Sequence, residues 1–380
     1  MTEKDKPAPE NKFHNDPLKE IVKGNLEEDR LQQGRREEIA SKWMEGSGTD
    51  ADIVISSRVR LARNIRKLPF PPLASDEQRE KVFQLAETVL QNQEEEQKHE
   101  LRMLSMSSLS AISRQVLVEK HLISPLLARE SRFSALILRD DEVISIMVNE
   151  EDHFRIQCLF PGLQLEKAWQ EASHYDDFLE SKVEYAFHEE KGYLTACPTN
   201  VGTGLRASVM LHLPALVITQ QINRILAAVN QVGLAVRGLY GEGTEIIGNL
   251  LQISNQITLG QSEEEIWHNL YGVTRQLINQ EKNAREHLLN EGREKLADRA
   301  GRAFGILKYA RMIDSNEAMQ LISDVRLGVD LGLIKNVPVK ALNELLVLTR
   351  PGCLQYLKGR ALSAYERDLE RAVQIQKYLP

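Results

Sequence analysis

The order of apolar and polar residues divides the chain into a polar start, a middle of strands and helices, and a helical end. Residues 1–34 hold few apolar anchors among Lys, Glu, Asp, Asn and Pro, so this segment cannot bury enough surface to fold alone. A short helix that follows it could dock through Ile39, Trp43 and Met44. Residues 1–50 are therefore expected to form a polar tail with one short helix.

Between residues 51 and 282 the pattern predicts strands with intervening helices. The expected elements are a strand from Ile53, a helix capped by Ser75 and Gln78, strand-like texture over residues 101–157 with a hairpin at 134–148, a long helix after Gly162, a helix at Pro214, and strands in LAVRGLY and NLLQISNQI. Strands outnumber the crossover helices, so we expect one mostly antiparallel sheet flanked by helices, an α+β fold.

Strand patterns stop near Ser262. The segment SEEEIWHNLYGVTRQLINQEKNAREHLL predicts one long helix, and three or four more helices follow to Pro380. This change predicts an α+β domain over residues 51–282 and an all-α C-terminal domain over residues 283–380. Amphipathic helices such as the one after Ser262 need a surface that buries their apolar face, which favours a homodimer through the C-terminal domain.

The composition is that of a soluble globular protein. Apolar residues make up 42% and charged residues 27% of the chain, and a formal net charge of −7 disfavours general binding to nucleic acid. Three scattered cysteines, Cys158, Cys197 and Cys353, indicate neither a disulfide framework nor a zinc site. No apolar run approaches the roughly 18 residues of a membrane helix, and the N-terminus lacks a signal-peptide core. We therefore expect a cytoplasmic protein without direct membrane binding.

One segment, CPTNVGTGLRASVMLHLPAL, brings together a thiol, two glycines and an arginine before it turns apolar. Gly202 and Gly204 let the backbone adopt a positive φ or approach a ligand closely, because they have no Cβ. Arg206 offers a planar fork of donors that suits phosphate oxygens. From these residues alone, a glycine turn that enters a buried strand explains the segment equally well.

The same segment resembles the signature CPxNxGTGxRAS of the phosphagen (guanidino) kinase family. Other blocks of that family stand in the expected order: SSRVRLARN from Ser56, EKHLIS from Glu119, NEEDHFRIQ from Asn149 and RGLYGEGTE from Arg237. The resemblance covers roughly residues 51–282. It implies an enzyme that transfers a phosphoryl group from ATP to a guanidinium group.

Phosphoryl transfer depends mainly on positioning and on neutralising phosphate charge, so such a site needs convergent cations. Arg58 and Arg60 are two residues apart and would share one face of a strand. A solvated surface charge is the ordinary explanation for a single arginine, whereas five arginines at family positions favour phosphate binding. The resemblance implies that ATP is bound by Ser56, Ser57, Arg58, Val59, Arg60, His121, Arg155, Arg206, Ala207, Ser208, Val209, Met210, Arg237, Gly238, Leu239, Tyr240 and Gly241.

Two parts of the nucleotide site stay open at this point. His121 matches the family's histidine near the adenine and ribose, but a half-buried structural histidine is the alternative. ATP implies Mg²⁺, yet no carboxylate cluster in the sequence predicts a dedicated metal cage. The ion could be held mainly by phosphate and water oxygens, so no metal ligand is assigned.

A guanidinium acceptor is cationic and a poor nucleophile, so two carboxylates would help to hold it and accept its proton. The resemblance implies that Glu151 is the base and that Glu242 is its partner. Of the adjacent acids Glu150, Glu151 and Asp152, only one aimed inward can touch the substrate, and the choice of Glu151 depends on the resemblance. Cys197 matches the family's reactive cysteine, which implies an orienting role and a lowered thiol pKa beside positive charge.

The arrangement of the chain separates two branches of the family. Kinases of small guanidino compounds carry a folded helical domain before the catalytic domain, whereas this chain has about 50 mostly polar residues there and about 100 residues after it. This arrangement resembles the bacterial protein arginine kinases, which implies phosphorylation of arginine side chains in proteins. The alternatives are a free-guanidino phosphagen kinase and a non-catalytic phosphoarginine reader or adaptor, and the intact glutamates and arginines argue against the reader.

The segment RDLERA is expected to open the last helix. Arg367 and Arg371 are four residues apart on one helical face, where a phosphate between them would relieve their repulsion. Asp368 could meet a guanidinium. The segment resembles the R-D-x-x-R-A pocket of protein arginine kinases, which implies an allosteric phosphoarginine site made of Arg367, Asp368, Arg371 and Ala372. An ordinary charged helix with internal salt bridges is the alternative.

The resemblance also implies partners. It suggests a role in protein quality control and the stress response, in which phosphoarginine marks proteins for a Clp-type protease and heat-shock repressors are among the targets. A zinc-binding activator protein is a further expected partner. The sequence itself does not name the protein substrates.

Overall fold

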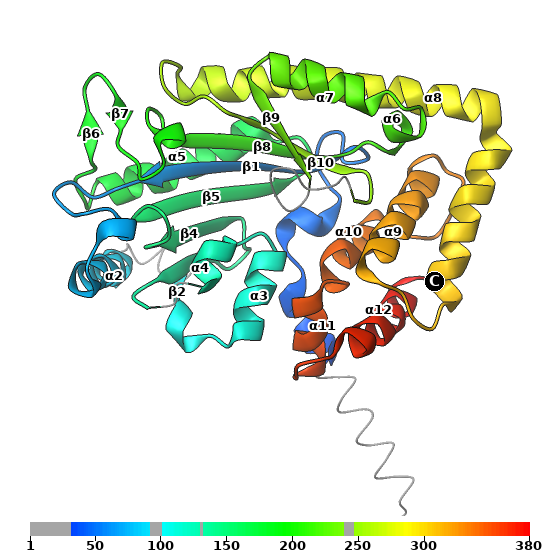
Figure 1. Cartoon of the computed structure of the whole chain (residues 1–380), viewed down its shortest axis with the longest axis horizontal. Helices are drawn as coiled ribbons and strands as arrows, with labels where there is room; N and C mark the ends of the chain where they lie inside the picture. The colour runs from blue at the N-terminus through cyan, green and yellow to red at the C-terminus, as the bar shows by residue number, and fades with distance from the viewer. Residues whose placement is uncertain (1–31, 92–100, 130–131, 239–246) are drawn as a thin grey trace, which may run out of the picture.

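The computed structural model describes residues 32–91, 101–129, 132–238 and 247–380 (Figure 1). Its centre is an eight-stranded sheet in the order β2-β3-β4-β5-β1-β8-β10-β9, in which all neighbouring strands are antiparallel. The strands are β1 (Val54–Arg63), β2 (Leu101–Ser105), β3 (Ala135–Arg139), β4 (Ile144–Val148), β5 (Phe154–Pro161), β8 (Leu205–His212), β9 (Leu234–Gly238) and β10 (Leu250–Asn255). A separate short hairpin joins β6 (Phe187–His188) and β7 (Gly192–Tyr193). The predicted antiparallel α+β fold is confirmed.

Helices cover the sheet and form the C-terminal part of the chain. They are η1 (Lys42–Glu45), α2 (Asp76–Gln91), α3 (Ala111–Glu119), α4 (Pro125–Arg129), α5 (Leu165–Glu180), α6 (Pro214–Ile218), α7 (Ile222–Gln231), α8 (Glu263–Tyr309), α9 (Ser315–Asp330), α10 (Val339–Leu348), α11 (Pro351–Lys358) and α12 (Ala364–Tyr378). The apolar sides of α2 and of α5 to α8 share one core with alternate strand residues such as Val59, Leu61 and Val209. This core closes the first face of the sheet.

The second face of the sheet is covered in two separate places. Near its β2 edge, α3 and α4 pack over Leu136 and Met147. Near its middle, η1 and the helices α9 to α11 pack over Ile55, Leu159 and Met210. Polar side chains of the central strands occupy the strip between these two apolar patches, so the fold leaves a polar floor flanked by two walls.

The predicted cap of α2 forms, because Ser75 and Gln78 exchange hydrogen bonds at the start of this helix. The structure adds a capping box of Ser262 and Glu265 at the start of α8. Within α8 the backbone leaves the helical region at Gly292, where the helix bends downward in Figure 1. The predicted domain boundary at residue 282 therefore lies inside α8, ten residues before this bend. No helix within the described residues is long and apolar enough to cross a membrane.

The strand-like texture predicted for residues 101–157 is wrong between Ser110 and Arg129. Two helices, α3 and α4, occupy this stretch. The Ser110 side chain accepts a hydrogen bond from the backbone N–H of Ser113, 3.0 Å away, and so caps α3. Val116 and Glu119, three residues apart, are the buried residues of α3, so one side of this short helix is anchored. The cap was a local signal that the apolar pattern concealed.

Candidate active site

Five predicted arginines gather on the polar floor of the sheet. Arg58 and Arg60 on β1 face the same way, as their spacing predicted, and together with Arg155 and Arg237 they line one cavity of about 250 Å³. Arg206 on β8 lies directly opposite Arg60 in the strand register. The fold thus brings together four strands, each of which carries at least one arginine to the same place.

The electrostatics of this cluster favour a bound anion. Burial and the charges of Arg155, Arg206 and Arg237 lower the pKa of Arg58 to about 10. Burial and three neighbouring guanidinium groups lower the pKa of Arg60 well below its usual value. Like charges directly opposite each other in a sheet are destabilising, and Arg60 Nε has no hydrogen-bond partner among the residues that the structure describes. A polyphosphate would relieve both costs through charge-assisted hydrogen bonds.

Strand alternation divides the predicted ATP-binding blocks between the two faces of the sheet. On the cavity side, Arg58 donates from Nε to Ser208 Oγ at 3.3 Å and from Nη2 to Gln252 Oε1 at 2.8 Å. Ser56 and Met210 lie beside Arg58 on the same side. Four other side chains lie on the opposite side of the sheet, buried against the core or against the loop before α5: Ser57, Val59, Ala207 and Val209. Only the backbone of these four residues could reach a nucleotide.

His121 lies in the wall of the cavity, in the turn between α3 and α4. Its φ of 61° is unusual for a residue with a side chain, and its carbonyl accepts a hydrogen bond from Gln157 Nε2 at 2.7 Å. Its ring centroid lies 5.6 Å from that of Trp43. Burial, Arg58 and Arg350 lower the pKa of His121 to about 3, so the imidazole is neutral. The ring therefore offers one donor and one acceptor to the cavity.

The three adjacent acids after β4 have different environments. Burial alone would raise the pKa of Glu150, but the Arg155 guanidinium, 2.8 Å away, and hydrogen bonds from Ser124 and the Glu151 backbone hold it below its usual value. Burial and the charges of Glu150 and Asp152 raise the pKa of Glu151, which is only half-buried. A reachable carboxylate with raised proton affinity suits a general base. Glu151 is thus the acid of the three that fits this chemistry.

Asp152 holds the cysteine loop beside these acids. Its Oδ1 accepts hydrogen bonds from Asn64 Nδ2 at 2.6 Å and from the Ala196 backbone N–H at 2.7 Å. Cys197 follows directly and is half-buried, with its Sγ 3.0 Å from Thr199 Oγ1. The other two cysteines of the chain are buried, and burial raises the pKa of both thiols. Cys197 is therefore the accessible thiol, and it follows the residue whose backbone Asp152 holds.

The signature glycines are required by close packing of the backbone. Gly202 has a φ of 115°, and a Cβ there would come within 2.3 Å of the carbonyl oxygen of Thr258. Gly204 has a φ of 66°, and a Cβ would lie 2.6 Å from the carbonyl oxygen of Ala62. Glycine tolerates both conditions because it has no side chain. These two positions shape the turn that carries Arg206 into β8.

Four predicted site residues lie outside the part of the chain that the structure describes: Leu239, Tyr240, Gly241 and Glu242. Gly238 lies inside that part, lines the arginine cavity and pairs with Leu251 at the end of β9. The predicted role of Glu242 as partner of Glu151 stays a prediction.

Sequence reasoning missed the two glutamines of the floor. Gln157 on β5 and Gln252 on β10 both line the arginine cavity. Gln157 follows Arg155 two residues later on β5, Gln252 precedes Ser254 by two residues on β10, and both glutamines face away from the main core. This alternation of polar residues was the available signal.

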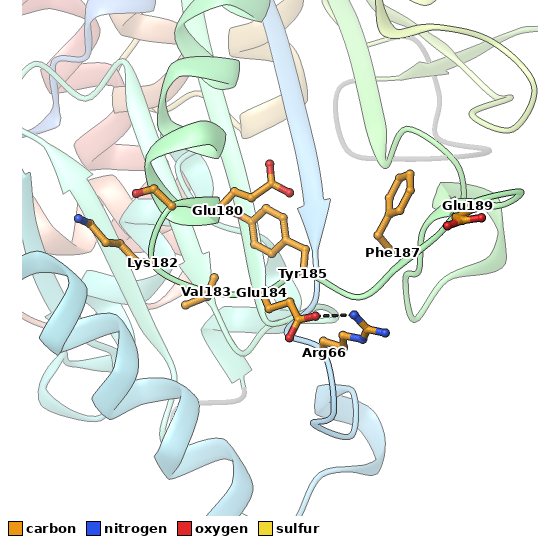
Figure 2. Close-up of a pocket in the computed structure, with 9 residues that line it drawn as sticks. Arg66, Glu180, Lys182, Val183, Glu184, Tyr185, Phe187 and Glu189 are labelled. Atoms are coloured by element: carbon orange, nitrogen blue, oxygen red, sulfur yellow. Dashed lines mark hydrogen bonds and ion pairs between the residues drawn. The ribbon is translucent and has the colours of Figure 1, made fainter.

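A larger depression of about 660 Å³ lies elsewhere (Figure 2). It is lined by Arg66, Glu180, Ser181, Lys182, Val183, Glu184, Tyr185, Phe187 and Glu189. Arg66 forms an ion pair with Glu184 across its floor. The Ala186 N–H donates to the Asn64 carbonyl at 2.7 Å, and Asn64 in turn holds Asp152. Two contacts thus link the segment that lines this depression to Asp152, which follows Glu151 in sequence, while four of the predicted arginines line the smaller cavity.

The RDLERA segment begins α12 behind a capping box of Ser363 and Glu366. Arg371 is buried and donates to the carbonyls of Thr349 at 2.8 Å and Ile313 at 2.7 Å. It also pairs with Asp368 at 2.5 Å. Ala372 is buried in the core beneath α12, and Arg367 donates to the Leu362 carbonyl at 2.8 Å. The predicted aspartate and arginines are thus together at one end of α12.

Among the residues that the structure describes, no group of three or more His, Cys, Asp or Glu side chains is placed to hold a metal ion. The arginine floor, with Arg60 Nε lacking a partner there, fits the phosphates of a nucleotide. A magnesium ion would therefore depend largely on oxygen atoms of the nucleotide.

A cationic floor for phosphates beside a carboxylate of raised proton affinity defines the class of a phosphotransferase. Comparison with known proteins agrees. Residues 81–284 match the family described as ATP:guanido phosphotransferase, C-terminal catalytic domain, and residues 293–380 match the protein-arginine kinase McsB C-terminal domain. The crystal structure of lombricine kinase, whose sequence is 26% identical, superposes with a TM-score of 0.55, and the match covers 62% of this chain and 68% of that chain.

Curated relatives place the chain more narrowly. The protein-arginine kinase of Brevibacillus brevis is 57% identical over 339 residues, which cover 89% of this chain and 95% of the relative. That of Halalkalibacterium halodurans is 57% identical over 344 residues, which cover 90% and 96%. The chain belongs to the protein-arginine kinase family of the ATP:guanido phosphotransferases. The resemblance on which the sequence prediction depended is confirmed.

Proposed function

We propose that this chain transfers the γ-phosphoryl group of ATP to arginine side chains of proteins, and so produces ADP and protein phosphoarginine. The observation that carries this proposal is the floor of five arginines beside half-buried Glu151, whose pKa is raised. Curated relatives over most of the chain bear the name protein-arginine kinase. The acceptor guanidinium would then lie between Glu151 and the terminal phosphate.

In this mechanism the protein mainly positions the two substrates and neutralises the charge of the phosphates. Arg58, Arg60 and Arg206 hold the phosphates and offset the charge that spreads over the transferred group. Glu151 accepts the proton of the attacking guanidinium nitrogen as the new N–P bond forms and the bond between the γ-phosphorus and the bridging oxygen breaks. Cys197 and Glu242 orient the acceptor. Mg²⁺ bound with the nucleotide would cancel part of the phosphate charge.

An acceptor arginine inside a protein needs room for the polypeptide on both sides of it. The depression of about 660 Å³ adjoins the acceptor side through Asn64 and Asp152, and exposes Phe187 at its rim (Figure 2). We assign this depression to the substrate polypeptide. A kinase of free guanidino compounds, the alternative function, would not need it.

The product distinguishes these possibilities. A P–N bond to a guanidinium hydrolyses in acid, whereas a phosphoserine ester does not. After incubation with ATP and an unfolded protein, the phosphoryl label is expected to be lost on acid treatment and to map to arginine by mass spectrometry in neutral solution. Acid-stable label on serine or threonine would refute the proposal. Efficient turnover of free arginine with none on protein would establish the phosphagen kinase alternative.

The cellular role follows from the sequence resemblance. We assign the enzyme to the cytoplasm, where phosphoarginine would mark proteins for a Clp-type protease and regulate heat-shock repressors. A zinc-binding activator protein would be its partner, and no direct binding to nucleic acid or membrane is expected. The net charge of −7 supports the absence of general nucleic-acid binding.

The segment RDLERA is proposed as an allosteric phosphoarginine site. Burial lowers the pKa of Arg371, and although Asp368 opposes this shift, the charges of Arg350 and Arg367 add to it. Three guanidinium groups around one carboxylate are complementary to a phosphate attached to a guanidinium. Arg367 and the partly exposed Asp368 are the members that a ligand could reach, since Arg371 is buried.

Binding of free phosphoarginine to the full chain tests this site. Asp368→Ala and Arg367→Ala are each expected to weaken binding by about 10- to 150-fold, because each removes a hydrogen bond between charged groups. Kinase turnover without phosphoarginine should stay near wild type, because neither Arg367 nor Asp368 lines the arginine cavity. Equal binding by both variants and wild type would show that the start of α12 is an ordinary charged helix and not a phosphoarginine site.

A homodimer through the C-terminal helices is also proposed. Exposed apolar side chains cluster where α8 ends and α9 begins, at Ile306, Tyr309 and Met312, and Tyr309 is 78% exposed. A second copy would remove this surface from water.

A further inference from the structure

We propose that Glu119 is a positioning residue for the nucleotide, which fixes the wall of the arginine cavity to the N-terminus of α11. This inference rests on the proposed function, since it requires that the cavity binds ATP. Glu119 is the last residue of α3 and is buried. The wall in question runs from Val118 to Pro125.

The contact joins parts of the chain that are far apart in sequence. Glu119 Oε1 accepts a hydrogen bond from the Gly352 backbone N–H at 2.8 Å, and Oε2 accepts one from the Cys353 N–H at 2.8 Å. These are among the first N–H groups of α11, which have no partner within their own helix. A carboxylate at a helix N-terminus also interacts favourably with the helix dipole. One side chain thus satisfies two backbone donors 233 and 234 residues away.

The neighbours of Glu119 in sequence form the cavity wall. Val118, His121, Ile123, Ser124 and Pro125 all line the arginine cavity. Moving the end of α3 relative to the sheet would therefore move the side chains that contact a nucleotide. Glu119 has no place in the cavity lining, so it acts on the nucleotide only through these neighbours.

Other contacts keep this region folded when Glu119 is altered. Lys120 Nζ donates to the Glu38 carbonyl at 2.6 Å and pairs with Glu142 at 2.5 Å. The Trp43 indole donates to the Lys120 carbonyl at 3.2 Å. Leu122 is buried in the core beneath α3 and α4. Loss of the Glu119 contact is therefore expected to shift the wall without unfolding it.

The packing around Glu119 offers a second route to the same test. A Cβ on Gly352 would lie 2.6 Å from Gln115 Cγ and 2.9 Å from Glu119 Oε2. Gly352→Ala would displace either the start of α11 or the side chains of Gln115 and Glu119, while keeping the chemical identity of the glutamate. It therefore disturbs the same contact from the opposite side.

The chain also contains a matched control. Glu281 in α8 is buried and accepts hydrogen bonds from the first N–H groups of α6, at Ala215 and Leu216, each 3.0 Å away. Its chemistry is that of Glu119, a carboxylate that caps a helix in another part of the chain. The arginine cavity has no lining residue from α6 or α8.

The experiment compares full-length wild type with Glu119→Gln, Gly352→Ala and Glu281→Gln. Glutamine can accept with one oxygen only, and its amide group opposes the second N–H. Dissociation constants for ADP and KM values for ATP and for an unfolded protein are measured, with thermal midpoints as a check of folding. Glu119→Gln and Gly352→Ala are expected to raise the ADP dissociation constant at least about five-fold and to leave the KM for protein near wild type.

Glu281→Gln is expected to lower the thermal midpoint and to leave ADP binding unchanged. An unchanged ADP dissociation constant in folded Glu119→Gln and Gly352→Ala would overturn the inference, as would an equal rise in Glu281→Gln. A wild-type protein that binds ADP but phosphorylates no arginine would instead refute the proposed function. The two failures are therefore distinguishable.

Discussion

Replacement of Glu151 by alanine is expected to lower kcat by at least about 10²-fold while ADP affinity stays close to wild type. Glu151 is half-buried next to the arginine floor, and burial with the charges of Glu150 and Asp152 raises its pKa. Without it, no carboxylate in this position would accept the proton of the attacking guanidinium. Turnover measured by ADP release, together with ADP binding, separates loss of chemistry from loss of the nucleotide.

The pH dependence of the wild type provides a second readout. Protonated Glu151 cannot accept a proton, so kcat should fall as the pH drops through its pKa. Because this pKa is raised, the acid limb should lie above the usual value for glutamate, about 4.3. Near-normal turnover in Glu151→Ala would show that another acid is the base. A wild type with no turnover at all, but with phosphoarginine binding, would favour the reader or adaptor.

Arg206→Ala is expected to reduce kcat/KM for ATP by about 10²- to 10³-fold, the range found when one preorganised donor to a developing anion is removed. Arg206 lies opposite Arg60 and contributes to the positive field that lowers the pKa of Arg58. Initial rates at varied ATP concentration measure the loss. The KM for the protein substrate should change much less.

Arg66→Ala is the control for this variant. Arg66 is an exposed arginine that pairs with Glu184 in the larger depression and lies outside the arginine cavity. It is expected to leave ATP use unchanged. Equal effects of the two substitutions would mean that general charge, and not position on the floor, attracts the nucleotide.

The sheet could be predicted because the sequence pattern of a strand depends only on residues close together in the chain. Alternation in β1 and β8 separated core residues such as Val59 and Val209 from Arg58 and Arg206, and the cap at Ser75 formed as expected. Alternation and caps need only neighbours in sequence. The short helix α3 was missed although its capping residue, Ser110, stands directly before it, because several other serines stand nearby and no single one marks the start of a helix.

The sequence predicted which residues belong to the site, but not which residues they contact. The family blocks placed the arginines and Glu151, yet nothing in the sequence indicated that Asp152 would hold the backbone of Ala196. The pairing of Glu119 with the start of α11 was equally hidden. Such contacts join segments that are far apart in sequence and that only the complete fold brings together. No pattern among neighbouring residues predicts them.

The arginine floor is a small cationic region in an anionic molecule. The chain has a formal net charge of −7, whereas four guanidinium groups line a cavity of about 250 Å³ and a fifth, that of Arg206, lies opposite Arg60 in the sheet. At physiological ionic strength, charges act over about 8 Å, so a compact polyphosphate inside the cavity experiences mainly its attraction. An extended polyanion would also overlie the acidic remainder of the surface. The protein can therefore distinguish nucleotides from long polyanions by charge distribution, before any contact with the base.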